Sequence, residues 1–386
     1  MSLTTTPDED LAAAPAAATA SVDRGPVIVA DGRSSVGFTE PERDDQGWIS
    51  RWEPEDVHFW DATGAVVAKR NLVFSVFSEH VGFCIWSMWS VLVLFLGPAY
   101  GFDPSQKFLL TTIPALIGGV LRIPYTFATA KFGGRNFTIF SSIVLLIPLT
   151  ATAIVLKPGV SFGTLLVIAS LAGVGGGNFS SSMSNIDAFY PQRLKGWALG
   201  LNAGGGNLGV ASVQLVGLVI LATAGAAHPR YVLFFYIPFV IVATVGAASR
   251  MDNLRTASND KGAMREAVRE GNSWIIIALY LATFGSFIGF GFAFGQVLLT
   301  QFSDQFATPA DAARLTIVGP LVGSLIRPYG GKLADRYGGA RISLLMYALM
   351  IVGAGVVLAA SAASSLPVFI AGFTVLFALT GLASGS

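Results

Sequence analysis

The sequence GGVLRIPYTFATAKFGGR at residues 118–135 has a second copy, GSLIRPYGGKLADRYGG, at residues 323–339. In each copy an apolar stretch carries one arginine, Arg122 or Arg327, nine residues before a basic residue in a loop that contains two adjacent glycines. The two arginines are 205 residues apart, and the loops keep the same offset. Self-similarity at a fixed offset indicates a duplicated unit, so we predict two parallel copies of one fold.

Composition places both copies in a membrane. Mean hydropathy is +0.64, charged residues make up only 12%, and 44 of the 386 residues are glycine. Stretches of about twenty apolar residues are long enough to cross a bilayer, whereas a soluble core would interleave charges every third or fourth position. We therefore predict an all-α polytopic membrane protein whose tenth span is cut off by the end of the sequence. The predicted spans are 71–97, 109–130, 136–156, 163–184, 197–224, 231–249, 273–301, 313–331, 341–361 and 367–386.

The spans divide the chain into two halves. Residues 71–249 form a predicted six-helix half, residues 250–272 a charged linker, and residues 273–386 an incomplete second half. The repeat predicts about 70 further residues, so we expect that residues 1–386 alone would not transport. Residues 1–50 are rich in Ala, Asp, Ser and Pro and read as a disordered tail, followed by an approach segment at 51–70.

Basic residues in the loops predict the orientation. With the N-terminus inside, fourteen Lys and Arg residues lie in cytoplasmic segments and four in outer loops, which favours a cytoplasmic N-terminus in the plasma membrane. The net charge of +1 therefore reflects topology and indicates no nucleic-acid surface. The single cysteine, Cys84, lies in the first span and forms no intramolecular disulfide.

Of the 24 Lys and Arg residues, only Arg122 and Arg327 fall in the interior of apolar spans, since Arg314 and Arg341 stand at the loop ends of theirs. Nine helical residues span about 13 Å, so both side chains lie near the middle of a hydrocarbon layer about 30 Å thick. A charge at that depth is costly and normally faces the bundle interior for function, although a structural arginine bonded to carbonyls or snorkelling to the interface is the alternative. With no carboxylate expected beside them, the two arginines predict a positive site that selects anions.

The loop GKLADRYG at residues 331–338 resembles the signature loop of major facilitator transporters, Gly-x-Leu-Ala-Asp-Arg-x-Gly. The resemblance implies two parallel six-helix halves with the substrate bound at the midplane between them. It also implies a gating role for Gly331, Asp335 and Arg336. The first copy departs from the motif at Thr126 and Ala130, which weakens the gating role of that copy.

Four further runs, GLNAGGGNLG at 200–209, GGNFSSSM at 176–183, LYLATFGSFIGF at 279–290 and LRIPY at 121–125, resemble the NarK-type nitrate/nitrite porter family. The resemblance implies a pair of arginines that clamps the substrate and a pocket of aromatic and amide side chains. Nitrate is a planar monoanion, which a planar guanidinium can meet edge-on while aromatic rings cover its faces. The implied substrate-binding residues are Arg122, Arg327, Asn207, Phe179, Tyr280 and Phe284, and the implied signature residues are Asn178, Gly204, Gly205, Gly206 and Gly209.

These residues also have simpler interpretations. Glycines in membrane helices usually allow close helix packing, and Tyr280 and Phe284 taken alone would be ordinary core residues. The spacing Gly204-x-Gly206-x-x-Gly209 matches the dinucleotide-binding fingerprint, but it lies inside an apolar span with no preceding strand, so we reject that match.

Glu79 and His80 form the only ionisable pair elsewhere in the apolar spans, near the cytoplasmic end of the first. Either group could carry a coupling proton, because histidine titrates near neutral pH and a desolvated carboxyl approaches it. The alternative is a wet interfacial pair that bonds a nearby base such as Arg70. The expected lack of other midplane carboxylates favours exchange, in which nitrite resets the carrier.

We therefore predict a monomeric carrier in the lipid bilayer that exchanges nitrate for nitrite by alternating access. Proton-coupled nitrate symport, organic-anion transport by the same fold and a non-transporting nitrate receptor are the alternatives. No Walker loop, Cys/His metal spacing or nucleophile–base pair occurs in the sequence, so we expect no enzyme activity, no metal and no cofactor.

Overall fold

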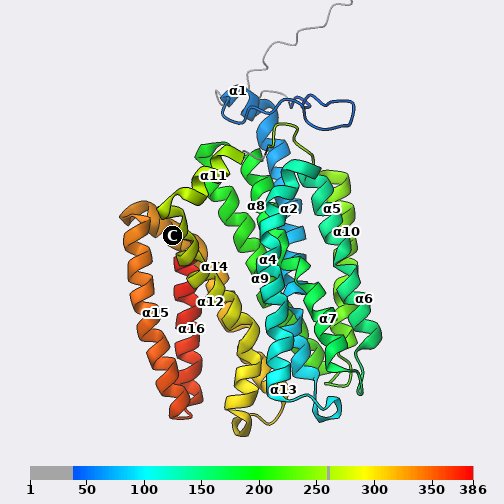
Figure 1. The fold of residues 1–386 in the computed structure, drawn as a ribbon, viewed down its shortest axis with the longest axis vertical. Helices are drawn as coiled ribbons and strands as arrows, with labels where there is room; N and C mark the ends of the chain where they lie inside the picture. The colour runs from blue at the N-terminus through cyan, green and yellow to red at the C-terminus, as the bar shows by residue number, and fades with distance from the viewer. Residues whose placement is uncertain (1–37, 259–260, 386) are drawn as a thin grey trace, which may run out of the picture. The chain divides into compact units, whose positions relative to one another are not determined.

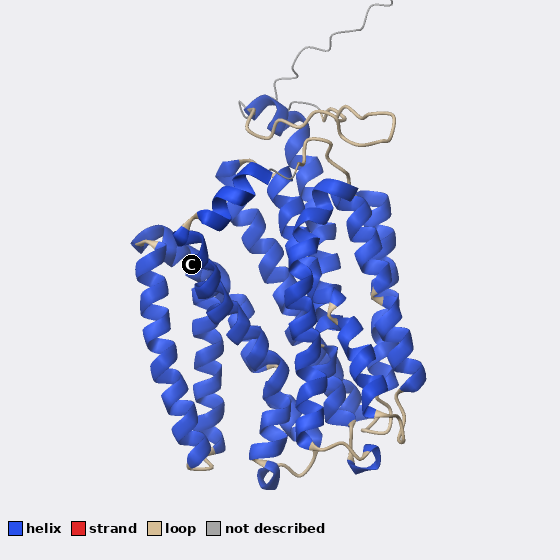
Figure 2. Cartoon of the chain, in the orientation of Figure 1, coloured by secondary structure: helices blue, strands red, loops and turns tan. Residues whose placement is uncertain are grey.

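The computed structural model describes residues 38–258 and 261–385, which are helical apart from short loops and two isolated β-bridges (Figure 2). The first half contains α1 (Val57–Phe59), η1 (Trp60–Gly64), α2 (Ala65–Trp86), α3 (Met88–Leu92), η2 (Val93–Phe95), η3 (Pro98–Tyr100), α4 (Pro104–Phe132), α5 (Gly134–Val144), α6 (Leu146–Val155), α7 (Phe162–Ala172), α8 (Val174–Phe189), α9 (Gln192–Thr223) and α10 (Arg230–Arg250). The second contains α11 (Lys261–Arg269), α12 (Gly271–Gln301), η4 (Ser303–Gln305), α13 (Pro309–Thr316), α14 (Val318–Tyr337), α15 (Gly339–Ala362) and α16 (Leu366–Gly385). The predicted all-α membrane fold is confirmed.

Within the described ranges, eight helices are long and apolar enough to cross a membrane, or nine if the bent pair at 57–86 and 88–95 is one span. The pair bends by 41° at Ser87, whose hydroxyl donates to the Phe83 carbonyl at 2.7 Å. A side chain that bonds the preceding turn competes with the helix ladder, which accounts for the break. The span predicted at 313–331 corresponds to α13 and α14. Because α14 carries several charged residues, it is not among the eight helices that are apolar enough to cross a membrane.

The two copies of the repeated sequence end in the same way. Gly133 after α4 has φ 85° and Gly338 after α14 has φ 90°, in the region of backbone space that favours glycine. The second glycine of each pair starts the next helix, α5 or α15. The paired glycines of both loops therefore have one structural cause, the sharp reversal between two spans.

The first half is a bundle in which α2 packs against α8 and α9, and α4 packs against α8. In the second half α16 packs against α12, α14 and α15 (Figure 1). The halves meet where α14 and α13 contact α9 and where α12 contacts α4. An aromatic cluster fills this junction and includes Trp86, Phe179, Phe284, Phe287 and Phe292.

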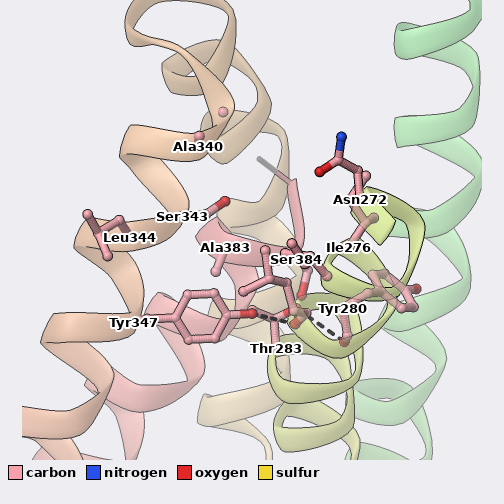
Figure 3. Close-up of a pocket in the computed structure, with 13 residues that line it drawn as sticks. Asn272, Ile276, Tyr280, Thr283, Ala340, Ser343, Leu344, Tyr347, Ala383 and Ser384 are labelled. Atoms are coloured by element: carbon pink, nitrogen blue, oxygen red, sulfur yellow. Dashed lines mark hydrogen bonds between the residues drawn. The ribbon is translucent and has the colours of Figure 1, made fainter. Parts of the chain in front are cut away.

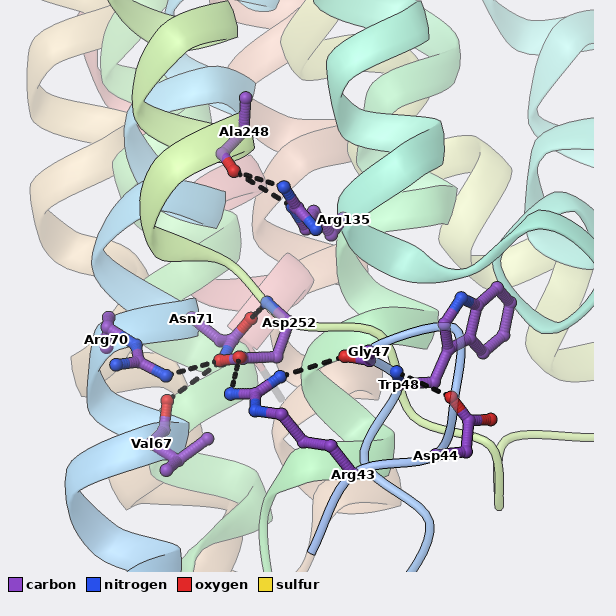
Figure 4. A network of polar contacts seen from close by, with 10 residues as sticks. All are labelled: Arg43, Asp44, Gly47, Trp48, Val67, Arg70, Asn71, Arg135, Ala248 and Asp252. Carbon is purple, nitrogen blue, oxygen red and sulfur yellow. Dashed lines mark hydrogen bonds and ion pairs between the residues drawn. The ribbon is translucent and has the colours of Figure 1, made fainter. Parts of the chain in front are cut away.

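Residues 39–50 are folded, so the prediction of a disordered tail reaching residue 50 is wrong for this stretch. Ile49 is fully buried and forms a bridge to Leu254, directly after α10. The Asp252 carboxylate accepts hydrogen bonds from Arg43 at 2.7 Å and from Arg70 at 2.8 Å (Figure 4). The predicted tail at residues 1–37 lies outside the described residues.

Within the predicted approach segment at 51–70, α2 begins at Ala65. Trp52 and Trp60 of this segment are buried, and the Trp52 indole donates to the Phe189 carbonyl at 3.2 Å. Aromatic burial against the end of α8 therefore holds residues 51–64 on the first half.

We expect the substitution Asp252→Asn to lower the stability of the first half by about 1–3 kcal/mol, because it removes a charge that three donors stabilise. Burial alone would raise the pKa of Asp252. Hydrogen bonds from Arg43, Arg70 and Asn71 outweigh this effect, so the pKa lies below its ordinary value. A lowered pKa means that the carboxylate stabilises the fold at neutral pH and loses this effect only as pH falls below about 4. Thermal unfolding in detergent, with limited proteolysis between residues 39 and 50, measures the change.

Asp187→Asn is the matched control, since Asp187 forms an exposed ion pair with Lys195 at 3.0 Å and its side chain is 51% exposed. Exposed pairs contribute little, so this variant should unfold like the parent. Equal behaviour of the two variants would show that the Asp252 network does not hold residues 39–50.

Candidate anion-binding site

Arg122 of α4 lies between aromatic rings from both halves. Its guanidinium carbon is 4.5 Å from the centre of the Phe179 ring on α8 and 4.4 Å from that of Phe284 on α12. Ring faces attract cations, and such contacts gain strength where water is excluded. Its Nε also lies 3.4 Å from the Gly176 carbonyl, but Nη2 is buried with no hydrogen-bond partner among the described residues.

Arg327 of α14 approaches the same ring from the second half. Its guanidinium carbon lies 5.9 Å from the Phe284 ring centre, and the residue is only 8% exposed. Its Nη1 is buried and likewise has no hydrogen-bond partner in the described part of the chain. The two predicted arginines therefore share one aromatic ring at the junction of the halves, and no carboxylate is within ion-pairing distance of either in these ranges.

Tyr280 lies one turn before Phe284 on α12, and the two rings stack with centres 5.3 Å apart and planes 5° apart. The Tyr280 hydroxyl lies beside the Arg122 guanidinium and interacts with it, but no described residue forms a hydrogen bond of normal distance and angle with this buried hydroxyl. Buried polar groups are nearly always bonded, so three unpartnered groups that can donate, from Arg122, Arg327 and Tyr280, require an explanation. A ligand that only accepts hydrogen bonds, and carries negative charge, would satisfy all three.

Glu79 of α2 is buried beside this site, contrary to two expectations from the sequence. It is 1% exposed and accepts hydrogen bonds from Asn202 at 2.6 Å and from the Ser182 hydroxyl. It also interacts electrostatically with Arg122 and Arg327. The prediction of arginines without a neighbouring carboxylate and the alternative of a wet interfacial Glu79 are therefore wrong.

The alternative in which Glu79 or His80 bonds Arg70 is also wrong. Arg70 bonds Asp252, and the His80 Nδ1 lies 2.9 Å from the Gly205 carbonyl of α9. The adjacent ionisable residues therefore face different groups, and only Glu79 reaches the electrostatic field of the arginines.

The glycine run of α9 mainly allows close packing on α2. An added Cβ would overlap α2 atoms at Gly205, Gly206 and Gly209, whereas Gly204 faces open space. At Gly206 the overlapping atoms belong to the Glu79 carboxylate. The small residue therefore makes room for a charged neighbour that any side chain would displace.

Asn207 and Asn178 are buried at 2% and 4% exposure, and the Oδ1 atom of each has no hydrogen-bond partner among the described residues. Asn178 packs against Gly82 of α2, so its amide nitrogen points towards that helix. Both amides are therefore buried within the bundle, with one acceptor atom on each left open.

In the second signature loop, Gly331 lies one helical turn after Arg327, and Arg336 lies at the end of α14. Gly331 faces the Gly385 carbonyl of α16, and Arg336 is exposed beside Tyr337. The side chain of Asp335 lies outside the described residues.

Two cavities approach the site. One, of about 510 Å³, is lined by Arg327, Met183, residues 196–203 of α9 and the ends of α14 and α16. The other, of about 750 Å³, lies between α12, α15 and α16, with Tyr280, Thr283 and Tyr347 on its walls (Figure 3). The Tyr347 hydroxyl donates to the Leu279 carbonyl across it.

Ser182 and Asn202 are buried polar residues beside the candidate site that the sequence analysis does not single out, although both stand in the runs that resemble the porter family. Each is buried, and Asn202 Nδ2 lies 2.9 Å from the Ser182 Oγ as well as bonding Glu79. Polar side chains inside apolar spans need partners, and that rule could have pointed to both.

Residues 77–386 match the model of the Major Facilitator Superfamily. The chain belongs to this superfamily. It is 36% identical over 358 residues to the "Nitrate/nitrite transporter NarU" of Salmonella typhimurium, covering 88% of this chain and 76% of that protein. It is 34% identical over 364 residues to the "Probable nitrate/nitrite antiporter NarK2" of Thermus thermophilus, covering 88% and 81%. The predicted membership of the nitrate/nitrite porter family is confirmed.

Solved structures show the same fold for this facilitator chain. A D-xylose-proton symporter superposes with a TM-score of 0.60 at 16% identity over 83% of this chain and 80% of that one. A partially occluded inward-open form of the Escherichia coli xylose transporter XylE gives 0.63 at 14% identity, over 83% and 82%. At these identities the likeness concerns the fold alone.

We expect Arg122→Lys and Arg327→Lys each to weaken nitrate binding by about 10- to 100-fold, because lysine keeps the charge but loses the planar pair of donors. Isothermal titration of the purified protein with nitrate measures the change. Arg314→Lys is the control, since Arg314 is an exposed cation of the second half with 66% of its side chain accessible. Unaltered affinity in both site variants would remove the arginines from the binding site.

Proposed function

We propose that the chain carries nitrate and nitrite across the plasma membrane by alternating access, with exchange of the two anions as its first mode. The curated relatives are named as nitrate/nitrite transporters and antiporters. The observation that carries the proposal is the cluster of unpartnered donors from Arg122, Arg327 and Tyr280. The halves at 71–249 and 273–386 would rock about this cluster, joined by the linker at 250–272.

Nitrate fits the cluster in charge, shape and size. It is a monoanion that only accepts hydrogen bonds, so it compensates two buried guanidinium groups that have no ion-pair partner. Its planar edge matches the fork of an arginine, and the stacked Tyr280 and Phe284 rings offer flat apolar faces. Nitrite shares the charge and planarity, which supports one site for both anions.

The cavity of about 510 Å³ gives the site an opening to one side, because it runs from residues 196–203 of α9 to Arg327. At the opposite end of the junction α13 packs against α9 and η2. One open and one closed end are what a carrier needs in each state of its cycle.

Glu79 favours proton-coupled nitrate uptake as the second candidate. The groups that face this carboxylate are the neutral donors Ser182 of α8 and Asn202 of α9, and the cations Arg122 of α4 and Arg327 of α14. An ionised Glu79 competes with the anion for the field of the arginines, whereas a protonated Glu79 leaves that field to the anion. Proton and nitrate binding therefore reinforce each other, which is the condition for symport.

The proposal also includes a cytoplasmic N-terminus, on the basis of the excess of basic residues in the segments on that side, and a carrier that works as a monomer. Asn207, Phe179 and Asn178 would complete the pocket, with Gly204, Gly205, Gly206 and Gly209 allowing α9 to move on α2. Gly331, Asp335 and Arg336 would act in gating at the end of α14.

Transport by the full-length protein in proteoliposomes separates the two modes. Nitrate entry that requires internal nitrite shows exchange, and entry into empty vesicles that follows an imposed pH gradient shows symport. An organic-anion carrier would ignore excess nitrate, and a receptor would bind nitrate without moving it.

If Glu79 couples the proton, Glu79→Gln should abolish at least 90% of uptake driven by the pH gradient, because the amide cannot release a proton, and it should leave nitrate/nitrite exchange in place. Tracer uptake in the two vesicle types measures both modes in one preparation. Glu266→Gln, at an exposed position of α11, is the control. Gradient-driven uptake that persists in Glu79→Gln would exclude this carboxylate as the coupling group.

A further inference from the structure

The closed end of the junction is held by one buried side chain, Gln214 of α9. Its Nε2 donates to the Ser90 hydroxyl of α3 at 2.8 Å and lies 3.4 Å from the Gly291 carbonyl of α12. Its Oε1 accepts from the Thr316 hydroxyl of α13 at 2.9 Å. Gln214 and Ser90 belong to the first half, whereas Gly291 and Thr316 belong to the second. Both ends of a single amide therefore reach across to the second half, and Ser90 holds the amide in place from its own side.

The contact is dry. Gln214, Ser90 and Thr316 are 2%, 1% and 1% exposed. Gly291 and Gly295 of α12 bring the helices close at the same level, because an added Cβ there would lie 3.2 Å from side-chain atoms of Val210 and Thr316. A buried amide with fully used donors and acceptors is the arrangement that specifies a single packing of two surfaces.

Gln214 stands on the far side of the candidate site from the open cavity. Along α9, residues 196–203 line the cavity, Asn202 bonds Glu79, and Asn207 precedes Gln214 by two helical turns on the same face. Along α9, the chain therefore passes first the open cavity, then the anion-binding region and finally the closed end of the junction.

Separation of the halves would cost few hydrogen bonds. Gln214 would keep its bond to Ser90 of the same half, and the Thr316 hydroxyl can donate to the Ala313 carbonyl of its own helix at 2.8 Å. Only the Gln214 Oε1 would thus be left unpaired, and water entering the opened end would solvate it. The Gln214 amide is fully hydrogen-bonded when the end is closed, and few hydrogen bonds are lost when it opens. Such a contact can form and break reversibly.

We propose that Gln214, with Ser90, Thr316 and Gly291, is the latch that keeps the end opposite the cavity closed, and that its release sets how often the anion site opens to that side. The inference rests on the proposed alternating access. The test below measures how accessible the closed end is to solvent, which requires neither nitrate nor transport. The latch and the proposed transport function can therefore fail separately.

Leu94 of η2 is a suitable reporter, since it is 5% exposed and its side chain lies beside Gly295 of α12. Cys84 is the only cysteine of the chain, so Leu94→Cys in a Cys84→Ser background gives one thiol at the closed end. We expect Gln214→Leu to raise the rate of maleimide labelling at this thiol by about 3- to 10-fold, the effect of losing one neutral buried hydrogen bond or two. Thr316→Val should raise it less, because the contact of the Gln214 amide with the Gly291 carbonyl of the second half remains.

Gln296→Leu is the matched control. Gln296 is a buried glutamine of α12 at 5% exposure whose amide donates to Thr300 at 3.2 Å in its own helix, so its loss should leave the labelling rate unchanged. A Gln214→Leu protein that labels at the parental rate, or a Gln296→Leu protein that labels equally fast, would overturn the latch. Monodisperse elution and parental thermal unfolding establish that each variant is folded.

A disulfide between Gln214→Cys and Thr316→Cys gives the converse test in the Cys84→Ser background. The oxidised form should retain nitrate binding through the cavity and lose more than 90% of transport, and reduction should restore transport. Transport that continues in the oxidised form would show that this end does not have to open, and loss of nitrate binding in the reduced form would instead contradict the proposed site.

Discussion

The placement of Arg122 between Phe179 and Phe284 is the constraint on which the rest of the structure depends. A guanidinium at the middle of a membrane needs compensation, and here most of it comes from ring faces supplied by both halves. No ion-pair partner satisfies Arg122 or Arg327 in the described part of the chain, so their remaining donors stay available. The same contacts that make the charge tolerable therefore keep it free for an anion and tie the site to the junction of the halves.

The fold could be predicted almost entirely from the sequence, because length and hydropathy identify most spans. The repeated sequence around Arg122 and Arg327 indicates the parallel duplication. The arginines could be predicted to face the interior, because a midplane charge is costly in lipid, whereas Phe179, Tyr280 and Phe284 followed only from the resemblance to the porter family. Residues 39–50 were mispredicted, since their composition is polar and only tertiary contacts, such as Ile49 with Leu254, order them.

Glu79 shows what hydropathy cannot tell. Depth along a span follows from counting residues, but the helix face that a carboxylate occupies depends on how neighbouring spans are rotated. Gly206 leaves the space, and Ser182 and Asn202 supply the donors, from two helices distant in sequence. The hydrogen bonds of Gln214 could not be predicted for the same reason, because its partners come from α3, α12 and α13 and no local sequence pattern links them.

The bridge between Ile49 and Leu254 has a consequence for the mechanics of the chain. Because Arg255 N donates to the Ile49 carbonyl and Asp252 bonds Arg43 and Arg70, the first residues after α10 are fastened to the first half. The tether between the halves therefore starts only after Arg255 and is shorter than the loop between α10 and α12. A shorter tether restricts how far two tethered bodies can separate and raises the effective concentration of each at the surface of the other. Residues 39–50 thus shorten the connection between the halves and limit how far the halves can move apart.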